Sequence, residues 1–479
     1  MTGLSKEKKD IAAAVERLQE GIFKISDAIW TYAELPLEEY KSSKLLADTL
    51  ARAGFSVEMG TGGMPTAFVA TWANGAGKPV IGFLAEYDAL PMLSQKGGVP
   101  EHDPVVPGAP GHGCGHNTMG TMQALTVIAL KEYAEENNLD CTLKYFGSPA
   151  EEMLVSRPYM IRAGAFEGVD VVIDCHTGND FSVGYGVDGA GMYSFTVTFS
   201  GKTAHSGGSP WMGRSATDAV ELMHAGTERM REHTPETERT HWVTVEGGEA
   251  PNVVPDRATT WYFIRDIDEN LEERYKWVMD CAKGAALMTQ TTYEVRFLTG
   301  CHQRHGNKAL AELIFENIQT VGKPGYTTEE EHFAKAVQKH ENIPQTGMEY
   351  GLQLKGDPPY RGGSSDVGDV TLIAPCATLR FPTRVPGNLP GHHWTVTATG
   401  NMDIAHKGLA AGAKVAAFTA YDLMTKPDRL GAIRKEFEEY SKAHPYKTFL
   451  PDEAEPPLGW NAELMAKYRN DMEEFYLEP

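Results

Sequence analysis

Short apolar runs alternate with helical segments along much of this chain, and that alternation restricts the fold more than any other feature. Runs of strand length occupy residues 79–85, 142–146, 169–173 and 377–381. Between the first two, residues 118–135 carry apolar side chains at the spacing of an amphipathic helix. Strands that alternate with helices are typical of a mainly parallel sheet covered by helices. The sequence therefore predicts an α/β fold.

The middle of the chain departs from this rhythm and predicts a second unit. Strand, helix, strand, strand, helix and strand follow one another there, at 192–199, 214–231, 240–245, 258–264, 269–287 and 292–298. This βαββαβ order is that of the ferredoxin-like split unit, whose entry and exit lie close together. We therefore expect an inserted ferredoxin-like domain at 188–300, and an α/β domain built from 1–187 and 301–479.

Length, charge and cysteine content limit the classes of protein to which the chain can belong. Its 479 residues exceed what one ordinary core organises, which agrees with two domains. A formal net charge of −21 would repel a phosphate backbone, so nucleic-acid binding is not expected. Six cysteines are too sparse for a disulfide framework, and neither a signal core nor a membrane-spanning run is visible. We expect a cytoplasmic protein that acts on a small molecule and has no membrane partner.

Chemically reactive side chains gather where the predicted strands of the α/β domain end. Ligands of open α/β sheets bind outside the carboxyl ends of the strands, so these loops can converge on one site. Their cysteine, histidine and acidic residues are Glu86, Asp88, Cys114, His116, Glu151, Glu152 and His176. Taken singly, each has an ordinary explanation, such as a structural cysteine or an acidic pair at a helix N-terminus. Together they are typical of a divalent metal site, and glycines on both sides of Cys114 allow close approach.

Five motifs, in this order, resemble those of the metal-dependent aminoacylase and glutamate-carboxypeptidase superfamily. They read GHGCGHNTMG at 111–120, GSPAEE at 147–152, DCHTG at 174–178, GKTAHSGGSPWMGRSATDA at 201–219 and APNVVPD at 250–256. The resemblance covers nearly the whole chain. It is greatest to the amidohydrolase branch that contains p-aminobenzoyl-glutamate hydrolase and the indole-acetyl-amino-acid hydrolases. It implies a di-metal α/β catalytic domain with an inserted domain that serves as a lid or in dimerisation.

The resemblance implies two metal ions and most of their ligands. Cys114 would bridge the ions as a thiolate. His116 and Glu152 would complete one ion, while His176 and a late histidine would complete the other. Zinc or manganese is expected, with cobalt and nickel as alternatives, because all four accept nitrogen, oxygen and sulfur ligands.

Three further roles near these ligands follow from the same resemblance. The late ligand lies two residues before a tryptophan, which indicates His392, although the adjacent His393 leaves that choice open. Glu151 would be the general base toward a metal-activated water. Many relatives have a histidine ligand two positions before Asp88, where this chain has the acidic residue Glu86. Asp88 is therefore interpreted as the side chain that orients His116, and the acidic residue suits a structural or a ligand role equally.

The inserted domain would add three residues to the site. His205, at the end of a predicted strand, would be an oxyanion donor that reaches the site of the partner subunit. Asn252 and Arg265 would bind the carbonyl and the carboxylate of the substrate, since a guanidinium fork matches a carboxylate. A salt bridge with a neighbouring aspartate is the alternative for Arg265. Residues 362–368 resemble a further family loop near the site, but they equally suit a tight turn.

We expect an amidohydrolase that cleaves the amide bond between an aromatic or acyl group and a small amino acid, of the p-aminobenzoyl-glutamate type. A dipeptidase or another N-acyl-amino-acid deacylase would use the same site. Cys114 as a nucleophile with His116 as its base is a competing mechanism, but it leaves the other ligand residues without a role. A non-catalytic metal-binding regulatory subunit is a further alternative, and it would not need Glu151. A homodimer is expected, with a paralogous partner subunit as the alternative.

Overall fold

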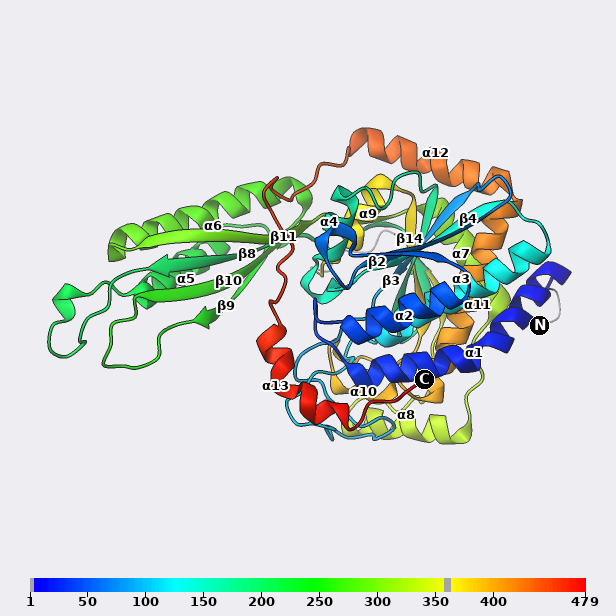
Figure 1. Ribbon diagram of the computed structural model, residues 1–479, viewed down its shortest axis with the longest axis horizontal. Coiled ribbons are helices and arrows are strands. Elements are labelled where there is room, and N and C mark those ends of the chain that lie inside the picture. The colour runs from blue at the N-terminus through cyan, green and yellow to red at the C-terminus, as the bar shows by residue number, and fades with distance from the viewer. Residues whose placement is uncertain (1–3, 357–362) are drawn as a thin grey trace.

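The computed structural model describes residues 4–356 and 363–479, and an eight-stranded sheet forms the centre of its α/β domain (Figure 1). In spatial order its strands are β1 (Ser56–Met59), β2 (Phe68–Asn74), β4 (Cys141–Gly147), β3 (Val80–Ala85), β5 (Val171–Gly178), β14 (Cys376–Pro382), β6 (Phe181–Gly184) and β13 (Leu352–Lys355). The central strands β4, β3, β5 and β14 run parallel, which confirms the predicted α/β sheet. Antiparallel pairing occurs farther out, between β2 and β4 and between β14 and β6.

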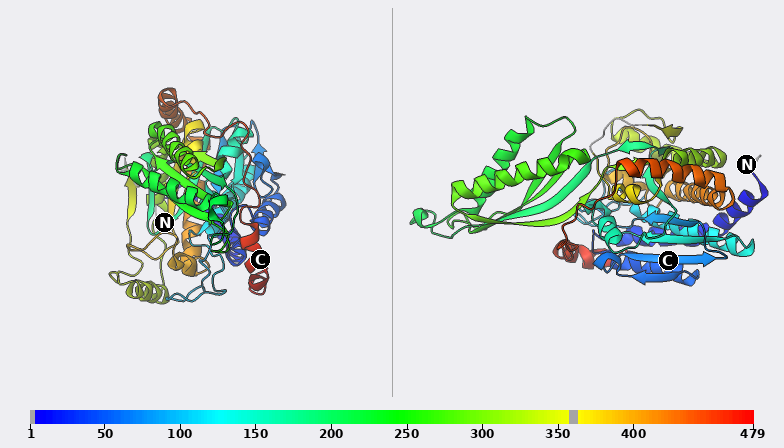
Figure 2. Two further views of the ribbon diagram at one scale, coloured as in Figure 1. Left: turned by 90° about the vertical axis from the view of Figure 1, so that its left-hand side faces the viewer. Right: turned by 90° about the horizontal axis from the view of Figure 1, so that it is seen from above.

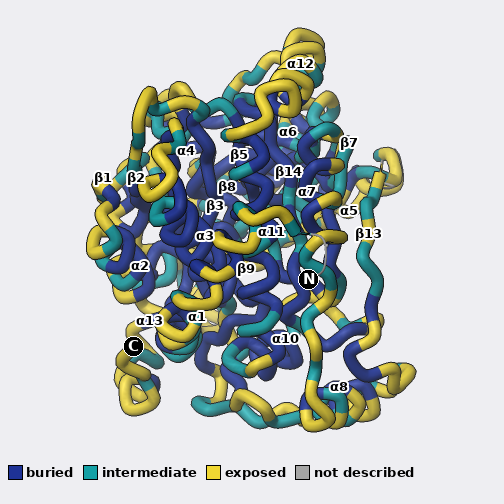
Figure 3. Tube along the Cα trace, turned by 90° about the vertical axis from the view of Figure 1, so that its right-hand side faces the viewer, coloured by how far each residue is buried: buried dark blue, intermediate teal, exposed yellow. Residues whose placement is uncertain are grey.

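Helices cover both faces of this sheet, so its central strands are apolar on both sides. One face shares a core with α1 (Lys6–Tyr32), α3 (His116–Glu136), α7 (Lys308–Val321) and α11 (Asp403–Thr425). The other face shares a second core with α4 (Ser156–Arg162) and α9 (Val367–Ile373). Phe83 and Leu84 are neighbours in β3 and belong to different cores, because successive strand side chains point to opposite faces. Figure 3 shows the central strands and α11 as the buried centre of the domain.

β5 is longer than the apolar run that predicted it. The sequence placed residues 174–178 in a loop after the strand, whereas β5 continues to Gly178. The cause is a partner that is distant in sequence, because β14 pairs with β5 in parallel as far as Pro382 and Gly178. His176 therefore lies on a strand and is held by the sheet.

The inserted domain has the predicted βαββαβ order. Its elements are β8 (Gly191–Ser200), α5 (Ala216–Arg231), β9 (Arg239–Glu246), β10 (Arg257–Asp266), α6 (Asp268–Thr289) and β11 (Thr292–Cys301). The four strands form an antiparallel sheet in the order β11-β8-β10-β9, and both helices share one core with it. Figures 1 and 2 show this domain as an arm that projects from the α/β domain. We call it the arm below.

Two features join the arm to the α/β domain. The chain enters through β7 (Gly186–Asp188) and leaves through β12 (Arg304–Gly306), and these short strands pair with each other. The extended segment between α12 (Pro427–Ala443) and α13 (Ala462–Glu473) then crosses the base of the arm (Figure 1). In that segment the ring of Trp460 lies 4.9 Å from that of Trp261 in β10. The arm is thus joined to the α/β domain by the β7–β12 pair and by the segment between α12 and α13.

The remaining elements are shorter or lie at the periphery. They are α2 (Tyr40–Arg52), α8 (Thr328–His340), α10 (Trp394–Thr399) and the 3-10 turns η1 (Thr61–Gly63), η2 (Glu151–Met153) and η3 (Pro210–Met212). Among residues 4–356 and 363–479, none of the helices combines the length and the apolar character that a bilayer span requires.

Phe195→Ala should lower the free energy of unfolding of the arm by about 3–5 kcal/mol, because it empties a fully buried position in β8. The Phe195 ring stacks on Tyr262 of β10 with centroids 5.7 Å apart. Urea unfolding followed by tryptophan fluorescence measures the change. The matched control is Phe475→Ala, at a ring that is 44% exposed, and it should cost less than about 0.5 kcal/mol. Equal losses in the two variants would contradict a core centred on Phe195.

Candidate metal centre

Three adjacent strands bring the predicted site residues to one edge of the sheet. Glu86 and Asp88 follow β3, Glu151 and Glu152 follow β4 in η2, and His176 lies near the end of β5. β4, β3 and β5 are neighbours in the parallel part of the sheet, so their carboxyl ends lie side by side. The loop that opens α3 reaches the same edge. The convergence expected from the strand order is therefore present.

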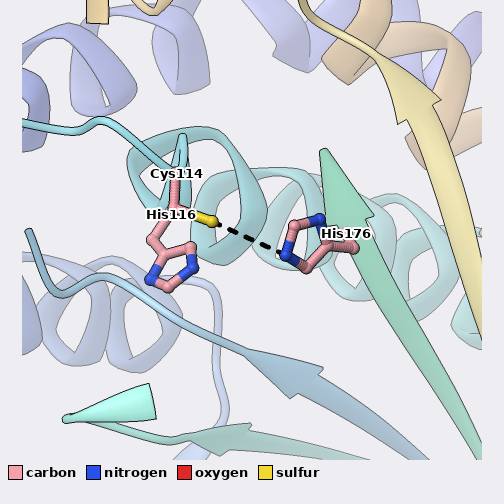
Figure 4. A group of neighbouring side chains, drawn as sticks. All are labelled: Cys114, His116 and His176. Carbon is pink, nitrogen blue, oxygen red and sulfur yellow. Dashed lines mark hydrogen bonds between the residues drawn. The ribbon is translucent and has the colours of Figure 1, made fainter. Parts of the chain in front are cut away.

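Cys114 and His176 face each other across this edge (Figure 4). The Sγ atom of Cys114 lies 3.6 Å from Nε2 of His176. The other ring nitrogen of His176 donates to the carbonyl of Thr177 at 2.8 Å, so Nε2 presents a lone pair. Burial lowers the pKa of His176 to about 4, which keeps the ring neutral. Burial raises the pKa of the Cys114 thiol, but the charge of His116 and the hydrogen bonds with the two imidazoles outweigh it and hold that pKa well below its usual value.

A glycine makes this close approach possible. Gly115 has a φ of 86°, and a Cβ at that position would lie 2.9 Å from Cγ2 of Thr177. A side chain there would push the thiol loop away from β5.

His116 is the first residue of α3 and is completely buried among carboxylates. Its Nδ1 donates to Oδ1 of Asp88 at 2.8 Å, and Oδ2 of Asp88 accepts the backbone N–H of Glu152 at 3.0 Å. Its Nε2 lies 3.3 Å from Glu86, 3.8 Å from Glu152 and 4.0 Å from Glu151. Burial lowers the pKa of His116, but the neighbouring charges of Cys114, Asp88 and Glu86 raise it overall. Asp88 thus holds in place both the His116 ring and the turn η2, which carries Glu151 and Glu152.

The donor atoms of this cluster fit a divalent metal centre. Three buried atoms have no hydrogen-bond partner among the described residues, namely Oε2 of Glu86, Nε2 of His116 and Oε1 of Glu152. Leaving such atoms unsatisfied costs about 1–3 kcal/mol each. Three sets have their donor atoms within 4.8 Å of one another: Cys114 with His116 and His176, Cys114 with Glu152 and His392, and Glu86 with His116 and Glu151. Thiolate, imidazole and carboxylate are the ligand types of zinc and related metals.

His392 faces the cluster, whereas His393 points elsewhere. Nε2 of His392 lies 3.3 Å from Oε2 of Glu152. Nε2 of His393 lies 3.9 Å from Glu341, which belongs to none of the three sets. The backbone of His392 has a φ of 52°, in the left-handed region that residues with a side chain rarely adopt. This turn before α10 sets the direction of the imidazole.

The donor atoms of the candidate ligands group by distance in another way than the arrangement that the resemblance implied. The resemblance implied His116 with Glu152 on one ion, and His176 with His392 on the other. In the structure Cys114 groups with His116 and His176, and separately with Glu152 and His392. The order of residues along a chain does not show from which side each imidazole approaches a shared thiolate, and the fold decides it.

Arg157 is a component of the site that no sequence motif indicated. It lies in α4, is completely buried, and donates from Nη2 to Oε1 of Glu86 at 2.7 Å. Its Nη1 donates to Asp366, which also accepts the backbone N–H of Arg157 at 3.0 Å. Burial raises the pKa of Glu86, and the charge of Arg157 opposes that shift. The only available signal was the loop 362–368, which contains Asp366, although Gly362 lies outside the described residues.

The three predicted residues of the arm lie in two places. Arg265 is at the end of β10 that joins the α/β domain, and its Nε donates to Oγ of Ser364 at 3.1 Å. His205 and Asn252 are exposed beyond the opposite end of the same sheet. Nδ1 of His205 accepts the backbone N–H groups of two following glycines at 3.1 and 3.0 Å. Neither of these two residues approaches the metal cluster of its own chain.

Comparison with known proteins shows one consistent relationship. The profile of peptidase family M20/M25/M40 matches residues 82–358. One of the subunits of p-aminobenzoyl-glutamate hydrolase from Escherichia coli (strain K12) is 35% identical over 471 residues, which cover 92% of this chain and 97% of that protein. The Xaa-Arg dipeptidase of Mus musculus is 28% identical over 448 residues, or 90% of this chain and 92% of the relative.

A solved structure supports the same fold. The aminobenzoyl-glutamate utilization protein from Klebsiella pneumoniae superposes with a TM-score of 0.58 at 19% sequence identity, and the match covers 82% of this chain and 96% of that one. The profile match spans more than half of the sequence, and the 35% identity extends along almost all of it. The chain therefore belongs to peptidase family M20/M25/M40.

Proposed function

We propose that the chain is a metal-dependent amidohydrolase that cleaves the amide bond between an aromatic or acyl group and a small amino acid. The observation that carries this proposal is the buried Glu151 carboxylate beside the ligand cluster, 4.0 Å from Nε2 of His116. A carboxylate in that place can move the proton that amide hydrolysis requires. The Escherichia coli relative, named for p-aminobenzoyl-glutamate hydrolase, supports an amide of this kind as the substrate.

We assign five residues as ligands of two metal ions. Cys114, His116 and His176 would hold one ion, and Cys114, Glu152 and His392 would hold the other, in keeping with the distances among their donor atoms. Zinc and manganese suit this mixture of sulfur, nitrogen and oxygen ligands. When bound, the two ions would polarise the substrate carbonyl and make the attacking water more acidic.

The chain's own residues supply the proton transfers in this mechanism. Glu151 takes a proton from the attacking water as the water oxygen bonds to the carbonyl carbon. It then delivers that proton to the amide nitrogen as the carbon–nitrogen bond breaks. Burial and the charge of Glu86 raise the pKa of Glu151, while His116 opposes the shift. A raised pKa suits a carboxyl that must hold a proton between the two steps, and Asp88 keeps His116 in place throughout.

The arm would complete the site of a second protomer in a homodimer. His205 would donate to the developing oxyanion there and Asn252 would bind the substrate carbonyl, whereas Arg265, at the base of the arm beside its own α/β domain, would bind the substrate carboxylate. The exposure of His205 and Asn252 at the far end of the arm supports this role in the partner's site. β9 is an edge strand with exposed Val243 and Val245, so it can pair with another chain. Because the Escherichia coli relative is named as one subunit of its enzyme, a paralogous partner stays as the alternative.

Removal of metal should abolish amide hydrolysis. Prolonged chelation strips the ions from the cluster, and added zinc or manganese should restore turnover because the ligands remain. Metal content and hydrolysis of an N-aroyl-glutamate are measured on the same samples. Hydrolysis that persists in protein shown to be free of metal would contradict the proposed function.

Glu151→Gln should retain metal and fold but lose turnover by about 10²–10⁴-fold, because an amide cannot shuttle the proton. Glu152→Gln should instead lower metal occupancy, since it removes a ligand atom that lies 3.3 Å from His392. The two variants are matched in position and chemistry, so each serves as the control for the other. If their behaviours were exchanged, the roles of the adjacent pair would be reversed.

Glu151→Ala and His205→Ala should each be nearly inactive alone but should complement each other when mixed. After statistical exchange of protomers, half of the dimers are heterodimers, and each of these has one site with both defects and one site with neither. The mixture should therefore recover about a quarter of wild-type activity. Native mass spectrometry verifies the exchange. Confirmed heterodimers without activity would show that His205 does not act across the interface.

A further inference from the structure

The turn that carries Glu151 begins where β4 leaves the sheet. The backbone N–H of Ser148 still donates to the carbonyl of Ala85 at 2.8 Å, and Pro149 has no N–H to donate. Ala150 then takes a left-handed conformation, with φ 53° and ψ 38°, at a completely buried position. Residues with a Cβ rarely adopt this conformation, because the Cβ crowds the following carbonyl oxygen. The surroundings of Ala150 must therefore hold it there.

Glu39, which directly precedes α2, supplies this support from a distant part of the chain. Its Oε1 accepts the backbone N–H of Ala150 at 2.8 Å, and its Oε2 accepts the hydroxyl of Thr66 at 3.0 Å. Thr66 is fixed in turn, because its carbonyl accepts the hydroxyl of Tyr87 at 2.6 Å. All four residues are buried. Because both of its oxygens are bonded, the carboxyl group of Glu39 has a fixed orientation and holds the Ala150 N–H in one place.

Glu151 therefore lies between two anchored residues. Glu39 holds the N–H of Ala150 on one side, and Asp88 holds the N–H of Glu152 at 3.0 Å on the other. The two carboxylates together fix the backbone from which the Glu151 side chain extends. A displacement of about 1 Å at a reacting group can cost about 100-fold in rate. The position of the Glu151 carboxylate thus depends on Glu39.

We propose that Glu39 is a positioning residue for amide hydrolysis: it holds Ala150 in the left-handed conformation and so sets the direction of the Glu151 side chain. This inference rests on the proposed function and adds to it a residue outside the ligand cluster. Glu39 belongs to none of the three sets of candidate ligands, and its contact with the catalytic turn is through the backbone of Ala150.

Steady-state kinetics test this role. Glu39→Ala removes the acceptor and should lower kcat for an N-aroyl-glutamate by about 10- to 100-fold, with KM within about threefold and unchanged metal content. Glu39→Gln keeps an amide oxygen that can accept the same N–H, so kcat should stay within about threefold of wild type. The matched control is Glu34→Ala. Glu34 is equally buried, but its carboxylate accepts the N–H groups of Lys41 and Ser42 in α2, so its loss should leave kcat unchanged.

Hydrogen exchange measures the same contact without turnover. In the protein as purified, amide exchange in residues 148–155 should be at least about tenfold faster in Glu39→Ala than in wild type, because the Ala150 N–H loses its acceptor. Glu39→Gln should exchange at nearly the wild-type rate. Glu34→Ala should accelerate exchange in the first turn of α2 instead and leave residues 148–155 unchanged.

Each outcome decides the proposal. An unchanged kcat in Glu39→Ala overturns it, as does an equal loss of turnover in Glu39→Gln or a loss of kcat that follows a loss of metal. If Glu39→Ala does not fold, Thr66→Val decides instead, because it removes only the second anchor of the carboxylate. That variant should lower kcat by about two- to tenfold at constant KM, the range of one hydrogen bond, and an unchanged kcat overturns the proposal.

The two measurements also separate this inference from the proposed function. Faster exchange of residues 148–155 in Glu39→Ala, found together with a wild-type protein that hydrolyses no amide, would refute the proposed function and leave the contact between Glu39 and the turn in place. Amide hydrolysis by wild type with no effect of Glu39→Ala on exchange or kcat would refute the role of Glu39 alone.

Discussion

The salt bridges of Arg157 with Glu86 and Asp366 are the interactions on which the metal centre most depends. All three side chains are buried, and the side chains of Glu151 and Asp174 are buried near them. Arg157 pairs with two of these carboxylates and its charge acts on the others. Loss of one partner of a buried ion pair typically costs about 3–5 kcal/mol, because the other charge remains without compensation. The fold can hold so many carboxylates at one sheet edge because this cation is buried with them.

The same ion pair lies in a continuous set of contacts between the arm and the candidate metal ligands. Arg265, at the base of the arm, donates to Ser364, two residues before Asp366. Asp366 then contacts Arg157, Arg157 contacts Glu86, and the free oxygen of Glu86 lies 3.3 Å from Nε2 of His116. The loop before α9 thus links the domain proposed to bind the carboxylate with the domain that holds the ligands. A shift of the arm would move this loop and, through Asp366, the guanidinium that holds Glu86.

Local sequence patterns predicted those features of the fold that neighbouring residues determine. The central strands and the βαββαβ order were predicted because apolar periodicity is a property of adjacent residues. The strands β6 and β13, at one end of the sheet, were missed, since each has only four residues and is held by a partner distant in sequence. Family motifs indicated the candidate ligand residues but not how their donor atoms group around Cys114. Arg157 was missed because its partner Asp366 lies 209 positions away and no short motif connects them.

The arginines near the metal centre differ in whether a carboxylate already balances them. Arg157 pairs with Glu86 and Asp366 and has no contact with solvent, so it stabilises the site from within. Arg380 and Arg384 contact only uncharged groups and the ligand cysteine among the described residues, and both line a pocket. The net charge of −21 does not set the sign of the charge there, because screening at physiological salt weakens interactions beyond about 8 Å. Local pairing decides the sign of the charge around each of these arginines.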